Sequence, residues 1–347
     1  MATSDLRGKI QTVLGTIDPE SLGPTLMHEH VICDITPPSM ATGCCCDHEP
    51  ITLENYWEIH YGTRPYPAKY RLDMVEVMRD EVARMHAAGG RAIVDLSNGG
   101  LKPDPGALAG ISRDTGVHIV MGCGHYVEEY QDRRNFERSV DDFAAEMVAQ
   151  VREGAWGTDV RAGIIGEIGC QAPWTELEKR VMRGAVLAQT ETGAALNIHP
   201  GRHHDQPQEI VDFLVVAGAD LSRTILSHID RTIFDDERLF RVADSGAVIE
   251  LDLFGIEQSF YPPNHAVDMP NDAERLRTVR RLVERGHIEQ VLISHDICYR
   301  TRLRRFGGHG YSHIFENVVP LMRRRGFTED EIDTILVDNP RRLLTFV

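Results

Sequence analysis

The chain has 347 residues, a formal net charge of −16 at pH 7, and 42% hydrophobic and 26% charged residues. These proportions are ordinary for a folded globular protein, and a chain of this length can bury a large core without disulfides. The acidic excess argues against a nucleic-acid ligand and against docking on an anionic membrane. The sequence shows neither the apolar stretch of a secretory signal nor the roughly 18 apolar residues of a spanning helix. We therefore expect a cytoplasmic protein whose partner is a small molecule.

Cysteine usage is consistent with that compartment. There are seven cysteines, an odd number, and their scattered spacing gives no disulfide framework. Three of them, Cys44–Cys46, are adjacent and lie close to His48. Zinc sites usually separate their cysteines by two to four residues, so we favour a loop of small side chains here over a metal knuckle.

Short apolar runs alternate with helical patterns along the chain. The runs predict eight strands, at Thr25–His30, Arg91–Ser97, Val117–Cys123, Ala162–Ile168, Ala194–His199, Thr224–Ile229, Ala247–Leu253 and Gln290–Asp296. Apolar residues at three- and four-residue spacing predict helices that include Leu72–Ala88, Val140–Val151, Thr175–Thr190, Gln208–Ala217 and Ala273–Arg285.

Eight strands alternating with helices predict the α/β class and a (β/α)8 TIM barrel. A doubly wound sheet is disfavoured because no Gly-x-Gly-x-x-Gly motif follows a strand. No linker or repeat divides the chain, so we expect residues 1–347 to form one barrel domain. Residues 33–70, rich in Pro, Cys and acidic side chains, are predicted to form a long loop after strand one that shapes a pocket.

Imidazoles and carboxylates recur where the predicted strands end. Because side chains two apart on a strand share a face, His28 and His30 point the same way, while Glu29 points away and is expected to be structural. The other four end strands four, five, six and eight: Glu167, His199, His228 and Asp296. Barrel enzymes place their active sites at this end of the strands.

Each of these six residues, taken alone, could be a hydrogen-bonded core residue or a helix cap. Together they point to metal, because several polar groups buried without a cation would cost several kcal/mol. Six donors suit two ions better than one tetrahedral zinc. We assign His28, His30 and Asp296 to the buried ion, His199 and His228 to the other, and Glu167 to the bridge between them.

In this interpretation a hydroxide shared by the two ions is the nucleophile, and Asp296 accepts its proton during attack. Zinc is the expected metal for such nitrogen and oxygen donors, although manganese, cobalt or iron would fit the same cage.

The chain resembles the phosphotriesterase family of the amidohydrolase superfamily, and more narrowly its phosphotriesterase-related branch. The resemblance rests on motifs spread over the whole sequence: Thr25–His30, Gly163–Cys170, His199–Arg202, Ser227–Thr232, Leu251–Gly255, Thr301–Leu303 and Gly307–His313. It implies a barrel with a binuclear site whose ligands fall on the six positions above. Members of the family are often dimers, so the resemblance is compatible with a homodimer.

One departure from the family pattern concerns the bridge. Phosphotriesterases proper use a carboxylated lysine on strand four, whereas none of the four lysines here (Lys9, Lys69, Lys102 and Lys179) lies on that strand. Glu167 occupies the place and supplies the same negative charge. The change argues against organophosphate triesters as the main substrates.

Relatives of this branch imply two chemistries. Animal members are associated with hydrolysis of N-acetyltaurine and related N-acyl amino acids, and other glutamate-bridged relatives resemble lactonases. We therefore expect an amidase for N-acyl amino or aminosulfonic acids. The alternatives are a lactonase or esterase with incidental phosphotriesterase activity, and a non-catalytic metal-containing binding protein.

An anionic substrate needs a cationic anchor. Arg202 and Arg231 follow two of the expected ligands, and Arg302 follows Asp296, so we expect all three to bind substrate. The alternative is that they pair with nearby acids such as Asp205 and Asp230. Further candidates for lining the pocket or donating a proton are Tyr126, His125 and the loop at Gly308–His313, for which a merely tight turn is the alternative.

Overall fold

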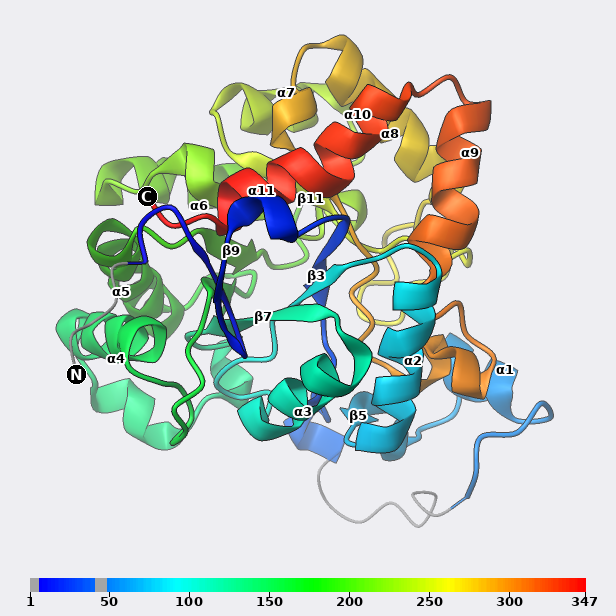
Figure 1. The fold of residues 1–347 in the computed structure, drawn as a ribbon, viewed down its shortest axis with the longest axis horizontal. Coiled ribbons are helices and arrows are strands. Elements are labelled where there is room, and N and C mark those ends of the chain that lie inside the picture. Colours follow the sequence, from blue (N-terminus) through cyan, green and yellow to red (C-terminus); the bar gives the residue numbers. More distant parts are fainter. Residues whose placement is uncertain (1–5, 41–48) are drawn as a thin grey trace.

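Eight parallel strands form a barrel in the computed structural model, which describes residues 6–40 and 49–347 (Figure 1). In sheet order they are β3 (Thr25–Glu29), β6 (Ala92–Asp95), β7 (His118–Cys123), β8 (Ile164–Gly169), β9 (Leu196–His199), β10 (Thr224–Leu226), β11 (Val248–Leu251) and β12 (Val291–Ile293). The barrel closes between β12 and β3. There the His28 N–H donates to Ser294 Oγ (3.1 Å) and the Asp296 N–H donates to the His28 carbonyl (3.1 Å). The predicted (β/α)8 TIM barrel is confirmed.

Helices surround the barrel on its outer side (Figure 1). They are α2 (Val75–Ala87), α3 (Pro105–Thr115), α4 (Val140–Arg152), α5 (Glu176–Thr192), α6 (Gln206–Ala217), α7 (Asp236–Asp244) and α8 (Asp272–Glu284), followed after β12 by α9 (Val319–Arg324), α10 (Glu329–Asp333) and α11 (Asn339–Leu344). The five helices named from the sequence all form. The short α7 and the glycine-containing α3 were not singled out, because their apolar periodicity covers few turns.

Two predicted strands end earlier than expected, for a backbone reason. Strand β10 stops at Leu226 and β12 at Ile293, whereas the predicted strands extend to Ile229 and Asp296. His228 and Asp296 adopt φ values of 56° and 49°, in the left-handed region that side chains other than glycine seldom adopt. Such conformations cluster at functional sites, and here they turn two of the expected ligands out of the strand direction.

The amino-terminal end of the barrel is closed by apolar packing. A hairpin of β1 (Ile10–Thr12) and β2 (Gly15–Ile17) lies across this end, and Ile10 packs with Leu343 and Leu344 of α11 against the barrel interior. The interior residues in this cluster include Met27, Val94, Val120, Ile164, Ile225 and Val248. Water is thus excluded at this end, and the polar side chains of the strands gather at the other.

The segment at residues 33–70, as far as the structure describes it, is folded onto the carboxyl end of the barrel. Its strand β4 (Cys33–Asp34) pairs antiparallel with β5 (Arg71–Leu72), and it contains helix α1 (Tyr56–Tyr61). Tyr56 donates a hydrogen bond to the carbonyl of Thr301 (3.0 Å), and Tyr61 stacks on Phe260 at 4.6 Å between ring centroids. The segment therefore covers the loops that follow β11 and β12. Cys44–Cys46 and His48 lie outside the described residues.

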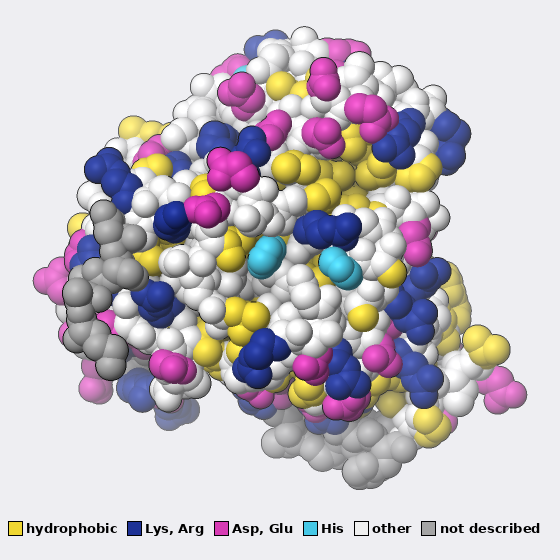
Figure 2. Space-filling model, viewed as in Figure 1, with side chains coloured by type: hydrophobic (Ala, Val, Ile, Leu, Met, Phe, Trp, Pro, Cys, Tyr) yellow, Lys and Arg dark blue, Asp and Glu magenta, His cyan; other side chains and the backbone are white. Residues whose placement is uncertain are grey.

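Charges of both signs are interspersed on the face shown in Figure 2, without a stripe of one sign. None of the helices in the described part of the chain is long and apolar enough to span a bilayer.

A buried ion pair ties the carboxyl end of β10 to helix α8. Arg275 Nε donates to Asp230 Oδ2 at 2.7 Å, and both side chains are buried. The same oxygen accepts the backbone N–H of Leu253, just after β11 (3.1 Å). Asp230 thus fixes the two loops that follow β10 and β11.

We expect Arg275→Ala to lower the free energy of unfolding by about 3–5 kcal/mol, because it leaves a buried carboxylate without its cation. Urea denaturation followed by circular dichroism measures this. The matched control is Arg277→Ala on the same helix, whose exposed pair with Glu274 should contribute little to stability. Equal losses for the two variants would contradict the assignment.

Candidate metal centre

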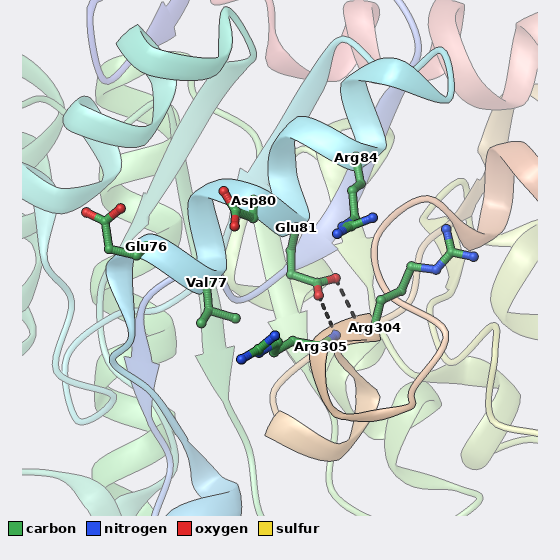
Figure 3. Close-up of a pocket in the computed structure, with 7 residues that line it drawn as sticks. All are labelled: Glu76, Val77, Asp80, Glu81, Arg84, Arg304 and Arg305. Carbon is green, nitrogen blue, oxygen red and sulfur yellow. Dashed lines mark hydrogen bonds between the residues drawn. The ribbon is translucent and has the colours of Figure 1, made fainter.

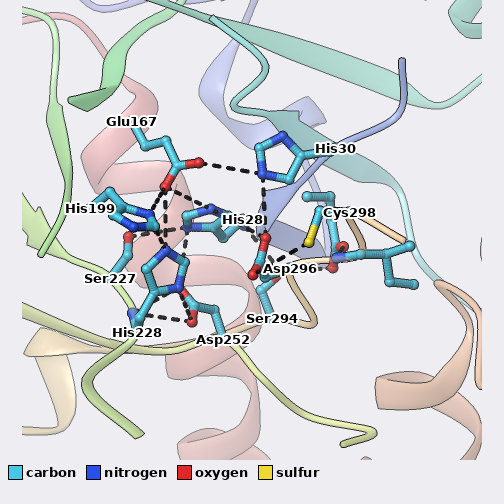
Figure 4. Close-up of polar contacts among 12 residues, drawn as sticks. His28, His30, Glu167, His199, Ser227, His228, Asp252, Ser294, Asp296 and Cys298 are labelled. Atoms are coloured by element: carbon cyan, nitrogen blue, oxygen red, sulfur yellow. Dashed lines mark hydrogen bonds and ion pairs between the residues drawn. The ribbon is translucent and has the colours of Figure 1, made fainter. Parts of the chain in front are cut away.

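Six side chains converge at the carboxyl end of the barrel, and the carboxylate of Glu167 points toward the imidazoles (Figure 4). Its Oε2 lies 2.8 Å from His199 Nδ1, 3.3 Å from His228 Nε2 and 3.5 Å from His28 Nε2. Its Oε1 lies 3.4 Å from His30 Nε2. Glu167 therefore faces all four imidazoles named from the sequence.

Asp296 completes the cluster from the end of β12. Its Oδ1 lies 3.3 Å from His30 Nε2 and 3.9 Å from His28 Nε2. The donor atoms of His28, His30 and Asp296 all lie within 4.8 Å of one another, and so do those of His28, Glu167 and His228. Each of these two groups has three donors, and the groups share His28. His199 adjoins the second group, because its Nδ1 lies 2.8 Å from His228 Nε2.

The buried acid Asp252, just after β11, holds two of these rings from behind. One oxygen lies 2.8 Å from His228 Nδ1, the other lies 3.1 Å from His28 Nδ1, and both accept the backbone N–H of His228. Glu250, two residues earlier, approaches His28 Nδ1 at 3.3 Å. Neither acid is among the site residues predicted from the sequence. Their spacing was nevertheless a sign of their role: two carboxylates two residues apart in an apolar strand share a face, and both must face the barrel interior.

A second type of contact orients His30. Its Nδ1 lies 3.1 Å from Ser97 Oγ, after β6, and its backbone carbonyl accepts the hydroxyl of Tyr311 at 2.7 Å. With Nδ1 of His28, His30 and His228 occupied by these partners, their Nε2 atoms face the carboxylates. This is the arrangement in which the outer ring nitrogen of a metal-binding histidine is hydrogen-bonded and the inner one binds the ion.

The structure itself offers a test of whether a cation fits this cluster. His28 Nε2 is buried and has no hydrogen-bond partner among the described residues, although it points at Glu167 and Asp296. A buried nitrogen without a partner costs free energy, whereas a divalent ion would use its lone pair. Imidazole and carboxylate donors are those that zinc and similar ions prefer. The residues present therefore fit a metal centre.

The surroundings shift the pKa values of the rings in this cluster in opposite directions. Burial lowers the pKa of His30, but Asp296 and Glu167 outweigh it and raise that pKa to about 9. Burial lowers the pKa of His199 to about 3, with Glu167 opposing and His228 and Arg231 assisting the shift. Burial opposes ionisation of Glu167, yet the surrounding imidazoles hold its pKa well below the usual range. The protonation states of these groups thus depend strongly on one another, as is common at functional sites.

A small cavity of about 50 Å³ opens beside the cluster, and the four expected substrate-binding residues, Tyr126, Arg202, Arg231 and Arg302, all line it. Arg202 Nε donates to Tyr261 Oη (2.9 Å), and Arg231 Nη2 donates to the Pro200 carbonyl (3.0 Å). The acids considered as alternative partners bind elsewhere: Asp205 binds Arg238 and Asp230 binds Arg275, each at 2.7 Å. Arg302 does approach an acid, since its Nη1 lies 4.0 Å from Asp296 Oδ2. Within residues 6–40 and 49–347, no carboxylate oxygen lies within 4.0 Å of the Arg202 or Arg231 guanidinium.

Three further sequence candidates lie away from this cavity. His125 Nε2 lies 2.8 Å from Glu146, on the side of α4. The tilted rings of His309 and His313 lie in a cluster with His295, and His313 Nε2 lies 2.7 Å from Asp272 Oδ2. The expectation that these histidines line the pocket was wrong: none of them lines this cavity, and His125 and His313 instead pair with acids on α4 and α8.

Glu29, expected to be structural, faces away from the metal cluster. Its carboxylate accepts the backbone N–H groups of His295 (3.0 Å) and Ile297 (2.9 Å) and the hydroxyl of Ser294 (2.9 Å). It fixes the β12 end on which Asp296 lies.

The model of the phosphotriesterase family matches residues 8–344. The chain belongs to the phosphotriesterase family. An N-acetyltaurine hydrolase from Tetraodon nigroviridis is 42% identical over 351 residues, which cover 99% of both chains. A resiniferatoxin-binding protein from Rhodobacter sphaeroides is 36% identical, with a TM-score of 0.91 over 98% of this chain and 96% of the other. A lactonase from Listeria monocytogenes is 25% identical, with a TM-score of 0.78 over 98% and 99%. This member of the phosphotriesterase family is an enzyme, a hydrolase that acts on a small molecule.

We expect Asp252→Asn to weaken metal binding about 10–100-fold, because the amide cannot accept from both His28 Nδ1 and His228 Nδ1. Competition with a chromogenic chelator measures the affinity. Ser97→Ala, which removes a neutral contact from His30 alone, is the matched control and should have a smaller effect. Unchanged affinity in Asp252→Asn would contradict the role given to this acid.

Metal affinity should rise with pH between about 7 and 9. His30, with its pKa raised to about 9, carries a proton at pH 7 that a cation must displace. For one displaced proton the affinity grows about tenfold per pH unit and levels off above the pKa. Calorimetric titration with zinc in buffers of different ionisation enthalpy measures both the affinity and the released proton. An affinity that stays flat or falls over this range would contradict the prediction.

Proposed function

We propose that this chain is a binuclear metal-dependent amidase for small N-acyl amino or aminosulfonic acids, with N-acetyltaurine as the representative substrate. The observation that carries the proposal is the placement of three guanidiniums around one small cavity beside the donor cluster. A substrate in that cavity would present its acyl carbon to the cluster and its anionic end to the arginines. The name of the relative from Tetraodon nigroviridis supports this choice of substrate.

Six residues would hold the two ions: His28, His30, Glu167, His199, His228 and Asp296. Zinc is the metal we expect, and manganese, cobalt or iron would suit the same donors. Two such ions, when bound, supply an activated hydroxide and polarise the acyl carbonyl.

Three side chains of the protein would perform the remaining tasks of the reaction. Glu167, which faces all four imidazoles, would help to hold both ions and supply the negative charge between the rings. The Asp296 carboxylate lies at the cavity wall, where it would accept the proton of the attacking water and return it to the departing amine nitrogen. Tyr126, whose ring packs edge-on against His199 (4.9 Å between centroids), would confine the acyl group.

The arginines would bind the anionic end of the substrate. A guanidinium matches the planar carboxylate, and presents several N–H donors to a sulfonate. Arg202 and Arg302 each keep N–H groups beyond the bonds that hold them, since Arg202 is held through Nε and Arg302 through Nη1. Arg231 lies closest to the cluster, with Nη2 3.2 Å from His199 Nε2.

The second candidate is a lactonase or esterase with incidental phosphotriesterase activity. The similarity to the Listeria monocytogenes lactonase favours it. The same attack on a carbonyl would open a lactone ring, but a neutral lactone makes no use of three arginines. A non-catalytic metal-containing protein is less consistent with the chain, because all six donors are present and converge.

A substrate panel on the zinc-loaded protein tests the proposal. We expect acetate release from N-acetyltaurine with a kcat/KM above that for any lactone or for a chromogenic phosphotriester. Acetate is measured by a coupled assay. Lactone opening far faster than amide cleavage would support the second candidate, and turnover of none of these compounds would reject both enzymes.

In the same assay we expect Glu167→Gln to lower kcat/KM about a hundredfold or more, because loss of a direct ligand exceeds the 10–100-fold effect of losing an outer partner. Glu176→Gln, an exposed change on the helix that follows the same strand, is the control and should leave the rate unchanged. A Glu167→Gln enzyme with full activity and full metal content would contradict the bridge.

A further inference from the structure

Arg302 begins a tight turn that follows β12. Its Nη1 donates to the Asp296 carbonyl at 2.5 Å, and its guanidinium lies 4.7 Å from the ring of Tyr299. The turn closes on itself, because the Arg302 carbonyl accepts the Gly310 N–H (2.8 Å) and the Leu303 carbonyl accepts the Gly308 N–H (2.9 Å). The position of this arginine therefore depends on the shape of the whole turn.

A carboxylate on a different element holds that turn from outside the barrel. Glu81 of α2 accepts the backbone N–H of Arg305 with Oε1 (2.8 Å) and that of Arg304 with Oε2 (3.2 Å), as Figure 3 shows. The other end of the turn also lies against it: a Cβ added at Gly310 would be 2.9 Å from Oε2. One side chain thus contacts both arms of the turn that presents Arg302.

Glu81 occupies a helix position that faces the interior, where burying a carboxylate costs free energy. Its side chain is 2% exposed, and its neighbours on the same face of α2 are the apolar Met78, Val82 and Met85. In the part of the chain that the structure describes, no lysine or arginine side-chain nitrogen lies within 4.0 Å of its carboxylate; backbone N–H groups are its only hydrogen-bond donors. Burial raises the pKa of Glu81, while those two N–H groups and, more weakly, the charges of Arg84 and Arg304 oppose the shift.

An apolar residue at position 81 would bury as well but would leave two backbone N–H groups without an acceptor. A carboxylate has two acceptor oxygens and no donor, so it accepts from two adjacent N–H groups through separate atoms, which defines the direction as well as the strength of the contact. The arrangement is therefore suited to fixing the turn rather than to stabilising α2.

We propose that Glu81 is a positioning residue for substrate recognition: it fixes the turn at residues 302–310 so that Arg302 points into the cavity beside the metal centre. The inference rests on the proposed function, in which Arg302 binds the anionic end of the substrate. Glu81 acts through Arg302 and makes no contact with the cavity itself.

The test compares Glu81→Gln with the unchanged protein on two matched amides, N-acetyltaurine and its neutral analogue N-acetylethanolamine. Glutamine keeps the size of the side chain but replaces one acceptor by a donor that faces a backbone N–H. We expect KM for N-acetyltaurine to rise about tenfold, the size of one charge-assisted hydrogen bond, with a far smaller change in kcat. Kinetics for N-acetylethanolamine should stay unchanged.

Two comparisons separate this role from a general loss of structure. Asp80→Asn, the next position on α2 and in the same groove, should change neither substrate's kinetics, because no hydrogen bond joins Asp80 to the turn. In an Arg302→Gln background, Glu81→Gln should add nothing to KM for N-acetyltaurine. Equal effects on the two amides, an additive effect in the Arg302→Gln background, or no effect on KM would overturn the proposal.

A readout without turnover keeps this test separate from the proposed function. Hydrogen exchange of the Arg304 and Arg305 amides should accelerate in Glu81→Gln, and calorimetry with taurine as the probe should show about tenfold weaker binding to the zinc-loaded variant. If the unchanged protein binds taurine but hydrolyses neither amide, the proposed function fails while this inference can still hold. Faster exchange with unchanged taurine affinity would overturn the inference alone.

Discussion

The structure depends on one electrostatic constraint: Glu167 is buried among four imidazoles at the end of the barrel. Each ring must keep a lone pair directed at the centre, so each needs a partner on its far side. Asp252 supplies this for His28 and His228, and Ser97 supplies it for His30. Carboxylates are well suited to this position, because an imidazole whose outer nitrogen donates to a carboxylate is a better ligand for a cation.

The barrel satisfies that requirement by separating its two ends. The hairpin at Ile10–Ile17 and helix α11 seal the amino-terminal end with apolar side chains, whereas strand ends and loops at the carboxyl end carry the polar ones. The left-handed conformations of His228 and Asp296 each cost free energy, on the order of 1 kcal/mol. Buried partners hold these conformations: Asp252 binds the His228 N–H, and Glu29 binds the N–H groups on both sides of Asp296. Rigid support of this kind is what keeps ligand atoms within reach of one another.

Features of the fold and the site that depend on neighbouring positions in the sequence could be predicted, and those that depend on distant positions could not. The eight strands and the six donors followed from apolar runs and from residues at their ends, and both involve only neighbouring positions. The hydrogen-bond partners of the donors were not found: the spacing of Glu250 and Asp252 indicates that both face the interior, but the rings that Asp252 contacts, His28 and His228, belong to other strands. His125 and His313 were misplaced for the same reason: the acids that bind them, Glu146 and Asp272, lie 21 and 41 residues away in the chain. Glu81 gave no signal, since its partners are backbone N–H groups 223 and 224 residues later.

Asp230 and Arg231 show why charge in the cavity could not be predicted from composition. They are adjacent, yet Asp230 turns inward to Arg275 while Arg231 turns to the cavity, so this acid does not neutralise its neighbour. Three guanidiniums then face one cavity in a protein whose net charge is −16. The overall field repels an approaching anion, and screening limits it to roughly 8–10 Å at physiological salt. In the proposed function, selection of an anionic substrate would therefore come from short-range hydrogen bonds, whose strength falls steeply with misalignment. The placement of each guanidinium, and of the groups that hold it, would then determine specificity more than the number of arginines.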